Sequence, residues 1–159
     1  MKLEVNEELY RYTFSEEGYL NESMTRVLYR TVTYIFDPDS FIICRKDAPE
    51  AKAVENPIVF PAVSRIEAQR AYVGALNNKK LQNDFKNLED DEYWKLFWRY
   101  LDDGARKLQD YEMFEERYRI KRIVDWCEEN YIPYFINKRD KFIKHIMDYN
   151  ICNVQMPEF

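Results

Sequence analysis

The stretch DDEYWKLFWRYL, residues 90–101, decides the fold, because it combines the densest run of large apolar side chains with one clear periodicity. At about 100° per residue the apolar positions share one arc, and charged residues lie opposite. The arc comprises Tyr93, Trp94, Phe97, Tyr100, Leu101 and Leu108. This pattern predicts an amphipathic helix that buries aromatic side chains.

A second helical pattern covers residues 110–130 and is apolar on two sides. Met113, Ile120, Val124, Cys127 and Tyr131 form one stripe, and Tyr111, Phe114, Tyr118 and Trp126 form the other. A helix with two apolar sides is typically central in its fold. Four cations of this segment, Arg117, Arg119, Lys121 and Arg122, spread around the helix, so we expect them to be its solvated flanks.

The N-terminal part of the chain has the composition of strands. Residues 27–36 are rich in β-branched and aromatic types, and residues 41–44 resume that pattern. Between them, Asp37-Pro38-Asp39-Ser40 has the residues of a type I turn. These features predict a β-hairpin, followed by a loop over residues 46–56 and a short apolar segment at 58–60.

Further helices are predicted after residue 63. Ser64 and Glu67 have capping-box spacing and mark a helix start; a short helix follows around residues 81–88, and a final one spans about 138–150. Residues 1–24 are acidic but interrupted by aromatics, which indicates a short helix or strand that packs down. The predicted fold class is α+β, with an N-terminal β-hairpin or small antiparallel sheet packed against four to five helices.

Length and composition exclude several classes of protein. The 159 residues fit a single domain, with 1–63 mostly β and loop and 64–150 helical. A net charge of −5 argues against a general polyanion binder. Three widely spaced cysteines indicate neither a disulfide framework nor a zinc site, and the N-terminus lacks a basic region followed by an apolar run. We therefore expect a cytoplasmic protein with no membrane segment and no cofactor.

Short motifs give the chain a family resemblance over about residues 26–132. They include Tyr34-Ile35-Phe36-Asp37, Trp94-Lys95-Leu96-Phe97, Phe114-Glu115-Glu116-Arg117 and, nearest of all, Trp126-Cys127-Glu128-Glu129-Asn130-Tyr131-Ile132. Together these motifs resemble Uncharacterised Protein Family 0158, a family of small bacterial proteins. That resemblance implies an α+β fold in a bacterial cytosol and no particular reaction. Where the family has a basic glycine-rich segment, this chain has Asp90-Asp91-Glu92-Tyr93-Trp94, which reverses the local charge.

Catalytic and metal-binding patterns are weak. His145 is the single histidine, and no Gly-x-Ser-x-Gly elbow accompanies any serine. The acidic clusters at 89–91 and 102–103 consist of adjacent residues, which point about 100° apart on a helix and do not converge on a metal. No catalytic residue and no metal ligand is predicted, although a carboxylate metal-dependent hydrolase remains an alternative.

Two groups of residues are candidates for binding. Trp98 lies at the edge of the aromatic arc with Arg99 beside it, and both residue types are favoured at protein interfaces; packing of Trp98 under the hairpin is the alternative. Lys138, Lys141 and Lys144 share a face of the last predicted helix. The preferred function is a non-enzymatic protein-interaction or regulatory protein with a protein partner. The alternative is a nucleic-acid-associated factor that uses the lysine face.

Overall fold

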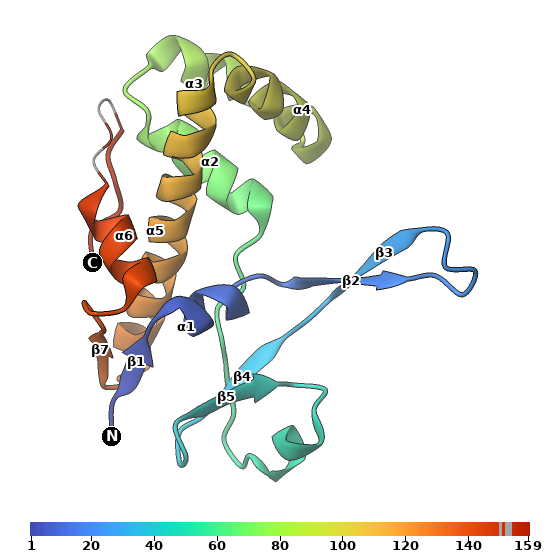
Figure 1. Ribbon diagram of the computed structural model, residues 1–159, viewed down its shortest axis with the longest axis vertical. Helices are drawn as coiled ribbons and strands as arrows, with labels where there is room; N and C mark the ends of the chain where they lie inside the picture. The colour runs from blue at the N-terminus through green and yellow to red at the C-terminus, as the bar shows by residue number, and fades with distance from the viewer. Residues whose placement is uncertain (150, 152–153) are drawn as a thin grey trace. The chain divides into compact units, whose positions relative to one another are not determined.

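The computed structural model describes residues 1–149, 151 and 154–159, and it combines short strands with α-helices (Figure 1). The predicted α+β class is confirmed. The chain forms two compact units, one of Met1–Val63 with Ile123–Asn137 and one of Ser64–Arg122 with Lys138–Phe159. The predicted boundary at 63/64 coincides with a boundary between these units, whereas 123–137 belongs with the N-terminal part. That both units form one domain stays a prediction.

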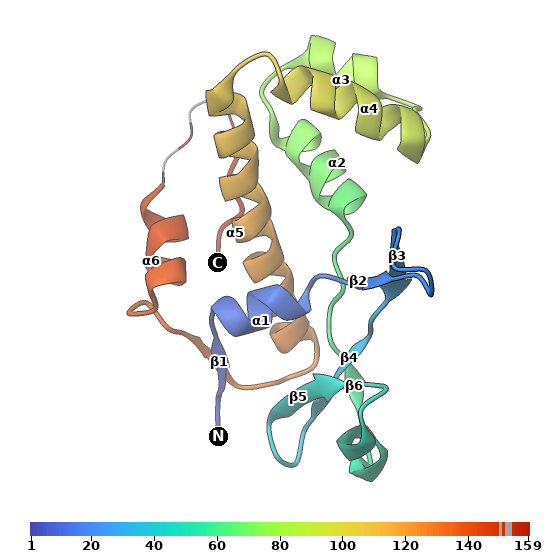
Figure 2. The same ribbon diagram turned by 45° about the vertical axis from the view of Figure 1, so that its right-hand side comes forward.

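Unit 1 contains three small sheets (Figure 2). Strand β1 (Leu3–Val5) pairs in parallel with β7 (Tyr134–Ile136), so the first residues of the chain are held by a segment more than a hundred positions later. Helix α1 (Glu7–Tyr12) follows β1, with Asn6 capping its start. Strands β2 (Glu16–Leu20) and β3 (Val27–Thr31) form a separate two-stranded ribbon.

The predicted hairpin is the third sheet. Strand β4 (Tyr34–Asp37) pairs antiparallel with both β5 (Ile42–Arg45) and β6 (Ile58–Val59), and a 3₁₀-helix, η1 (Pro49–Ala53), lies in the connecting loop. At the turn, Asp37 accepts hydrogen bonds from the Asp39 amide at 3.0 Å and the Ser40 hydroxyl at 2.9 Å. The hairpin prediction is correct here, but residues 27–36 form two strands separated by Val32 and Thr33 and not one.

The core of unit 1 is built around the C-terminal part of the long helix α5 (Ala105–Glu129). Trp126 meets Phe36 and Phe60 edge to face, at ring-centroid distances of 5.6 and 5.1 Å. Its indole N–H donates to the Val59 carbonyl oxygen at 2.9 Å, so the polar edge of this buried ring is satisfied. One side chain thus joins α5 to β4 and β6.

Unit 2 is helical, with α2 (Arg65–Ala75), α3 (Lys79–Phe85), α4 (Asp90–Leu101), most of α5, and α6 (Lys141–Asp148). Ser64 accepts from the Glu67 amide at 3.1 Å, as the sequence predicted. The core of unit 2 is an aromatic cluster. The ring centroid of Tyr72 lies 5.3 Å from that of Tyr111 and 5.2 Å from that of Phe114, and the centroids of Phe97 and Tyr111 are 4.8 Å apart. Helix α4 thus buries aromatic side chains, as predicted.

The buried arc of α4 is narrower than expected. Tyr93, Phe97 and Leu101, which follow each other at four-residue spacing, are buried, whereas Trp94 is 50% exposed. Leu108 belongs to the next helix and is 37% exposed. Tyr131 is 93% exposed because it follows the end of α5 with a φ of 56° and turns out of the predicted stripe.

The prediction that the cations of α5 are solvated is wrong for Arg117 and Arg119. Arg119 is fully buried, and its guanidinium donates to Glu115 from Nη2 at 2.9 Å and from Nε at 3.1 Å. Arg117 is half-buried and donates to the carbonyl oxygens of Ile146 and Pro157. These two arginines are internal links of unit 2 and not solvated flanks.

Candidate interaction surface

The β2–β3 ribbon extends away from the other strands of unit 1 (Figure 1). Its register pairs Glu16 with Thr31, Gly18 with Tyr29 and Leu20 with Val27. Because side chains alternate between the two faces of a strand, these six residues share one face of the ribbon. We call this the apolar face.

The apolar face is open to solvent. Tyr29 is 69% exposed, Val27 52% and Leu20 51%, and Met24 in the connecting loop is 71% exposed. A two-stranded hairpin alone is marginally stable in water, and contiguous exposed apolar side chains on a surface commonly mark an interaction site. The apolar face is therefore a candidate interaction surface of unit 1.

Gly18 shapes the apolar face. A Cβ atom at this position would lie 3.3 Å from Val27 Cγ1 and 3.5 Å from Tyr29 Cε1. The missing side chain lets the Tyr29 ring lie over β2, which places the ring on the side away from the outer edge of β3. The backbone of that edge is consequently left uncovered by its largest side chain.

The opposite face of the ribbon carries Glu17, Tyr19, Leu28 and Arg30, and ion pairs tie it to β5. Glu17 accepts from Arg30 at 2.9 Å and from both terminal nitrogens of Arg45 at 3.0 and 3.1 Å, and Arg45 also contacts Asp47. These contacts, with Arg45 first and Arg30 second, lower the pKa of Glu17 to about 2. Arg30 lies 5.0 Å from the centre of the Tyr19 ring. The opposite face is thus held within the unit through Glu17 and Arg30, and the apolar face is the candidate interaction surface.

The backbone of β3 has an open edge. At the two ends of the ribbon, the Asn21 amide donates to the Arg26 carbonyl oxygen at 3.0 Å and the Val32 amide to that of Ser15 at 2.7 Å. In an antiparallel ladder, hydrogen-bonded residue pairs alternate with non-bonded pairs. Counting inward from these two bonded end pairs, the backbone groups of Leu28 and Arg30 hydrogen-bond to β2. The N–H and C=O groups of Val27, Tyr29 and Thr31 then point outward. Within the described part of the chain, no third strand pairs with this ribbon.

The predicted Trp98 site lies on α4. Trp98 is half-buried and packs against the aromatic cluster of unit 2, and Trp94 meets it edge to face at 6.3 Å. Its indole N–H is buried, and no acceptor among the described residues lies within hydrogen-bond distance. Arg99 is exposed. The exposed tryptophan of the pair is Trp94, which the helical arc had placed in the core.

The predicted lysine face is only partly helical. Lys141 and Lys144 lie on α6 and line a shallow pocket with His145, Asp148 and Tyr149. Lys138 precedes Asp140, the residue that caps α6, and lies in a turn. The predicted helix start at 138 is therefore three residues early, because Asp140 accepts from the Phe142 and Ile143 amides. A binding role for the three lysines stays a prediction.

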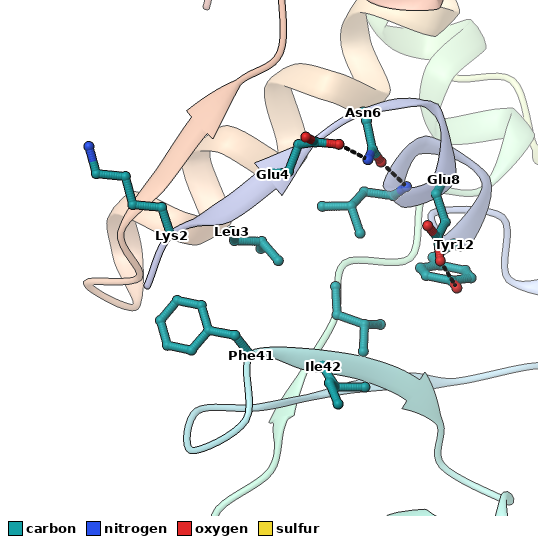
Figure 3. Close-up of a pocket in the computed structure, with 10 residues that line it drawn as sticks. Lys2, Leu3, Glu4, Asn6, Glu8, Tyr12, Phe41 and Ile42 are labelled. Carbon is teal, nitrogen blue, oxygen red and sulfur yellow. Dashed lines mark hydrogen bonds between the residues drawn. The ribbon is translucent and has the colours of Figure 1, made fainter. Parts of the chain in front are cut away.

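A pocket of about 310 Å³ lies between β1, α1 and the start of β5 (Figure 3). Both carboxylates that line the pocket accept hydrogen bonds. Glu4 accepts from the side-chain amide of Asn6, and Glu8 accepts from the Tyr12 hydroxyl at 2.7 Å. The bond to Glu8, with burial as the second cause, raises the pKa of Tyr12 to about 12. Both carboxylates are thus engaged by neighbouring side chains.

Among the described residues, no group of three or more histidine, cysteine and acidic side chains is placed to hold a metal ion. In the same part of the chain, no helix has the length and apolar character needed to span a membrane.

The sequence predicted a strand over residues 27–36 but not its pairing with residues 16–20, because residues 1–24 indicated only a short helix or strand. Two signals were present: a β-branched and aromatic run in β3, and a glycine opposite a tyrosine once the register is known.

Comparison with family models, with curated proteins and with solved structures finds no match for this chain. The resemblance to Uncharacterised Protein Family 0158 therefore stays a prediction from short motifs.

Proposed function

We propose that this protein works by binding another protein, and that the apolar face of the β2–β3 ribbon makes the contact. The observation that supports this most is the exposure of Leu20, Val27 and Tyr29 on a ribbon whose other face is held by ion pairs. Protein interfaces have a core that is poor in charge and enriched in aromatic side chains. Leu20, Val27 and Tyr29 are uncharged, and Tyr29 supplies an aromatic ring.

The energetic argument is one of transfer from water. Full burial of a Val, Leu or aromatic side chain is worth roughly 1.5–3 kcal/mol relative to exposure. Leu20, Val27 and Tyr29 are each at least half exposed, so a partner that covers them gains part of that amount from each. A loss of about 1.4 kcal/mol corresponds to a tenfold weaker complex, so removal of two such side chains is expected to reduce binding at least tenfold.

The test compares capture of partners from the source cell by variants of the tagged protein. The ribbon variant is Leu20→Ser/Tyr29→Ser. A matched control, Ile42→Ser/Val59→Ser, removes two other side chains of unit 1 that are each 59% exposed. Circular dichroism first establishes that each variant is folded. We expect the captured proteins to be lost with the ribbon variant and retained with the control.

Two further variants test the surfaces suggested by sequence. If capture survives in the ribbon variant and is abolished by Trp98→Ala, the interface lies on α4 instead. If the protein binds nucleic acid in a salt-sensitive way, and only the Lys138→Ala/Lys141→Ala/Lys144→Ala variant loses it, the nucleic-acid alternative replaces this proposal.

A further inference from the structure

The open edge of β3 is suited to a second copy of this chain. We propose that two copies pair through their β3 strands, antiparallel and about a two-fold axis at Tyr29. The inference goes beyond the proposed function, since it concerns the backbone edge of the ribbon and leaves the apolar face open to another protein.

The first support is the direction of the backbone groups. The outward N–H and C=O groups belong to Val27, Tyr29 and Thr31, which are spaced two residues apart and centred on Tyr29. In a two-fold antiparallel pairing, Tyr29 lies opposite Tyr29 of the second copy, and Val27 lies opposite Thr31. Each outward N–H of one copy then faces an outward C=O of the other, as an isologous interface requires.

The second support is the match of side chains across that pairing. Aromatic pairs and pairs of β-branched residues stabilise neighbouring strands by about 0.2–1 kcal/mol each. The pairing provides Tyr29 with Tyr29 and Val27 with Thr31, all on the apolar face. The Tyr29 ring lies over Gly18 and leaves the edge accessible to the approaching strand.

The third support is charge, which distinguishes the two edges of the ribbon. Strand β3 contains no acidic residue, and its one cation, Arg30, is paired with Glu17. Strand β2 contains Glu16 and Glu17, and Glu22 follows in the loop. In a chain with a net charge of −5, a second copy meets less repulsion at the β3 edge than at the β2 edge.

The size of the contact sets the expected strength. Stable interfaces bury roughly 1,200–2,000 Å² in total, and edge pairing of two five-residue strands contributes only part of that area. We therefore expect a reversible dimer whose population depends on concentration. Analytical ultracentrifugation from about 1 µM to about 1 mM brackets weak association, and the weight-average mass should rise from 19.5 kDa toward twice that value.

Proline substitution gives a matched pair of variants. Thr31 and Glu16 lie opposite each other, and the amide of each points to its own outer edge. Proline removes an N–H and is tolerated on an edge strand whose amide faces solvent. We expect Thr31→Pro to abolish the concentration-dependent rise in mass and Glu16→Pro to leave it unchanged.

Amide hydrogen exchange of the unmodified protein tests the same contact without a substitution. The Val27, Tyr29 and Thr31 amides should exchange at least tenfold more slowly at high than at low protein concentration, while the outward amides of Gly18 and Leu20 should not change. Loss of association with Glu16→Pro alone, assemblies larger than a dimer, or unchanged exchange at β3 would overturn the pairing.

The failure of this inference differs from that of the proposed function. A protein that stays monomeric at all concentrations but captures another protein through Leu20 and Tyr29 refutes only the second copy as partner. Dimerisation that depends on Thr31 supports the pairing, and the Leu20→Ser/Tyr29→Ser variant then tests the proposed function separately.

Discussion

Replacement of Arg119 by methionine tests whether a buried ion pair on α5 holds unit 2 together. Arg119 is fully buried, its Nη2 lies 2.9 Å from Glu115 Oε1, and the Glu115 side chain is only 16% exposed. Methionine fills a similar volume but leaves the Glu115 carboxylate without its cation. The variant therefore measures the cost of stranding a charge in the protein interior.

The magnitude follows from opposing terms. At an effective dielectric constant of about 20, two charges at this separation attract by about 6 kcal/mol, and desolvation costs several kcal/mol for each ion, so the net worth of the intact pair is small. Removal of one member is different, because the desolvation of the other stays uncompensated. We expect Arg119→Met to lower the free energy of unfolding by about 3–5 kcal/mol, which is a large part of the roughly 5–15 kcal/mol of a typical domain.

Urea unfolding followed by circular dichroism measures this loss. The double variant Glu115→Met/Arg119→Met should recover most of it, since both charges are then absent. Arg11→Met is the matched control, because Arg11 and Glu7 form an i, i+4 pair at 3.2 Å with side chains 70% and 46% exposed; its loss should be about 0–1 kcal/mol. If Arg119→Met costs no more than Arg11→Met, the reasoning is refuted.

Three further outcomes are expected. Ser64→Ala should lower the free energy of unfolding by about 0.5–2 kcal/mol, seen as a lower urea midpoint, because the Glu67 amide loses its cap. The Glu17 carboxylate should titrate near pH 2 by NMR, and Arg45→Gln should move this pKa up toward 4.5. Because the folded ribbon favours the charged form, its stabilisation is complete above about pH 4.5 and is lost as the pH falls through about 2. Calorimetry should show one unfolding transition, and two separate transitions would contradict a single domain.

Local patterns predicted the local structure. Ser64 begins a helix because its side chain satisfies an otherwise free amide three residues later, which depends on neighbouring residues alone. The turn at Asp37 is equally local, since its carboxylate accepts from Asp39 and Ser40. The α+β class follows from such signals added along the chain.

Pairings between distant segments were not predictable from the same signals. Residues 3–5 pair with 134–136, and neither segment is long enough to show a strand periodicity. Arg119 was wrongly predicted to be solvated, because a helical wheel gives the direction of a side chain but not which other segments cover it. The spacing of Glu115 and Arg119, four residues apart, was the available hint that a buried arginine has a partner.

The candidate surface depends on the same distinction between local and distant contacts. The β2–β3 ribbon is held by the Glu17 contacts with Arg30 and Arg45 and by the fit of Tyr29 over Gly18. Exposed ion pairs of this kind contribute about 0–1 kcal/mol each, so the ribbon draws little stability from its own contacts. A strand added to the edge of β3 supplies the hydrogen bonds that an isolated ribbon lacks. We therefore expect association to order the ribbon, so a substitution that loosens the ribbon, such as Arg45→Gln, should weaken association even though Arg45 belongs to β5 and contacts the face opposite the apolar face.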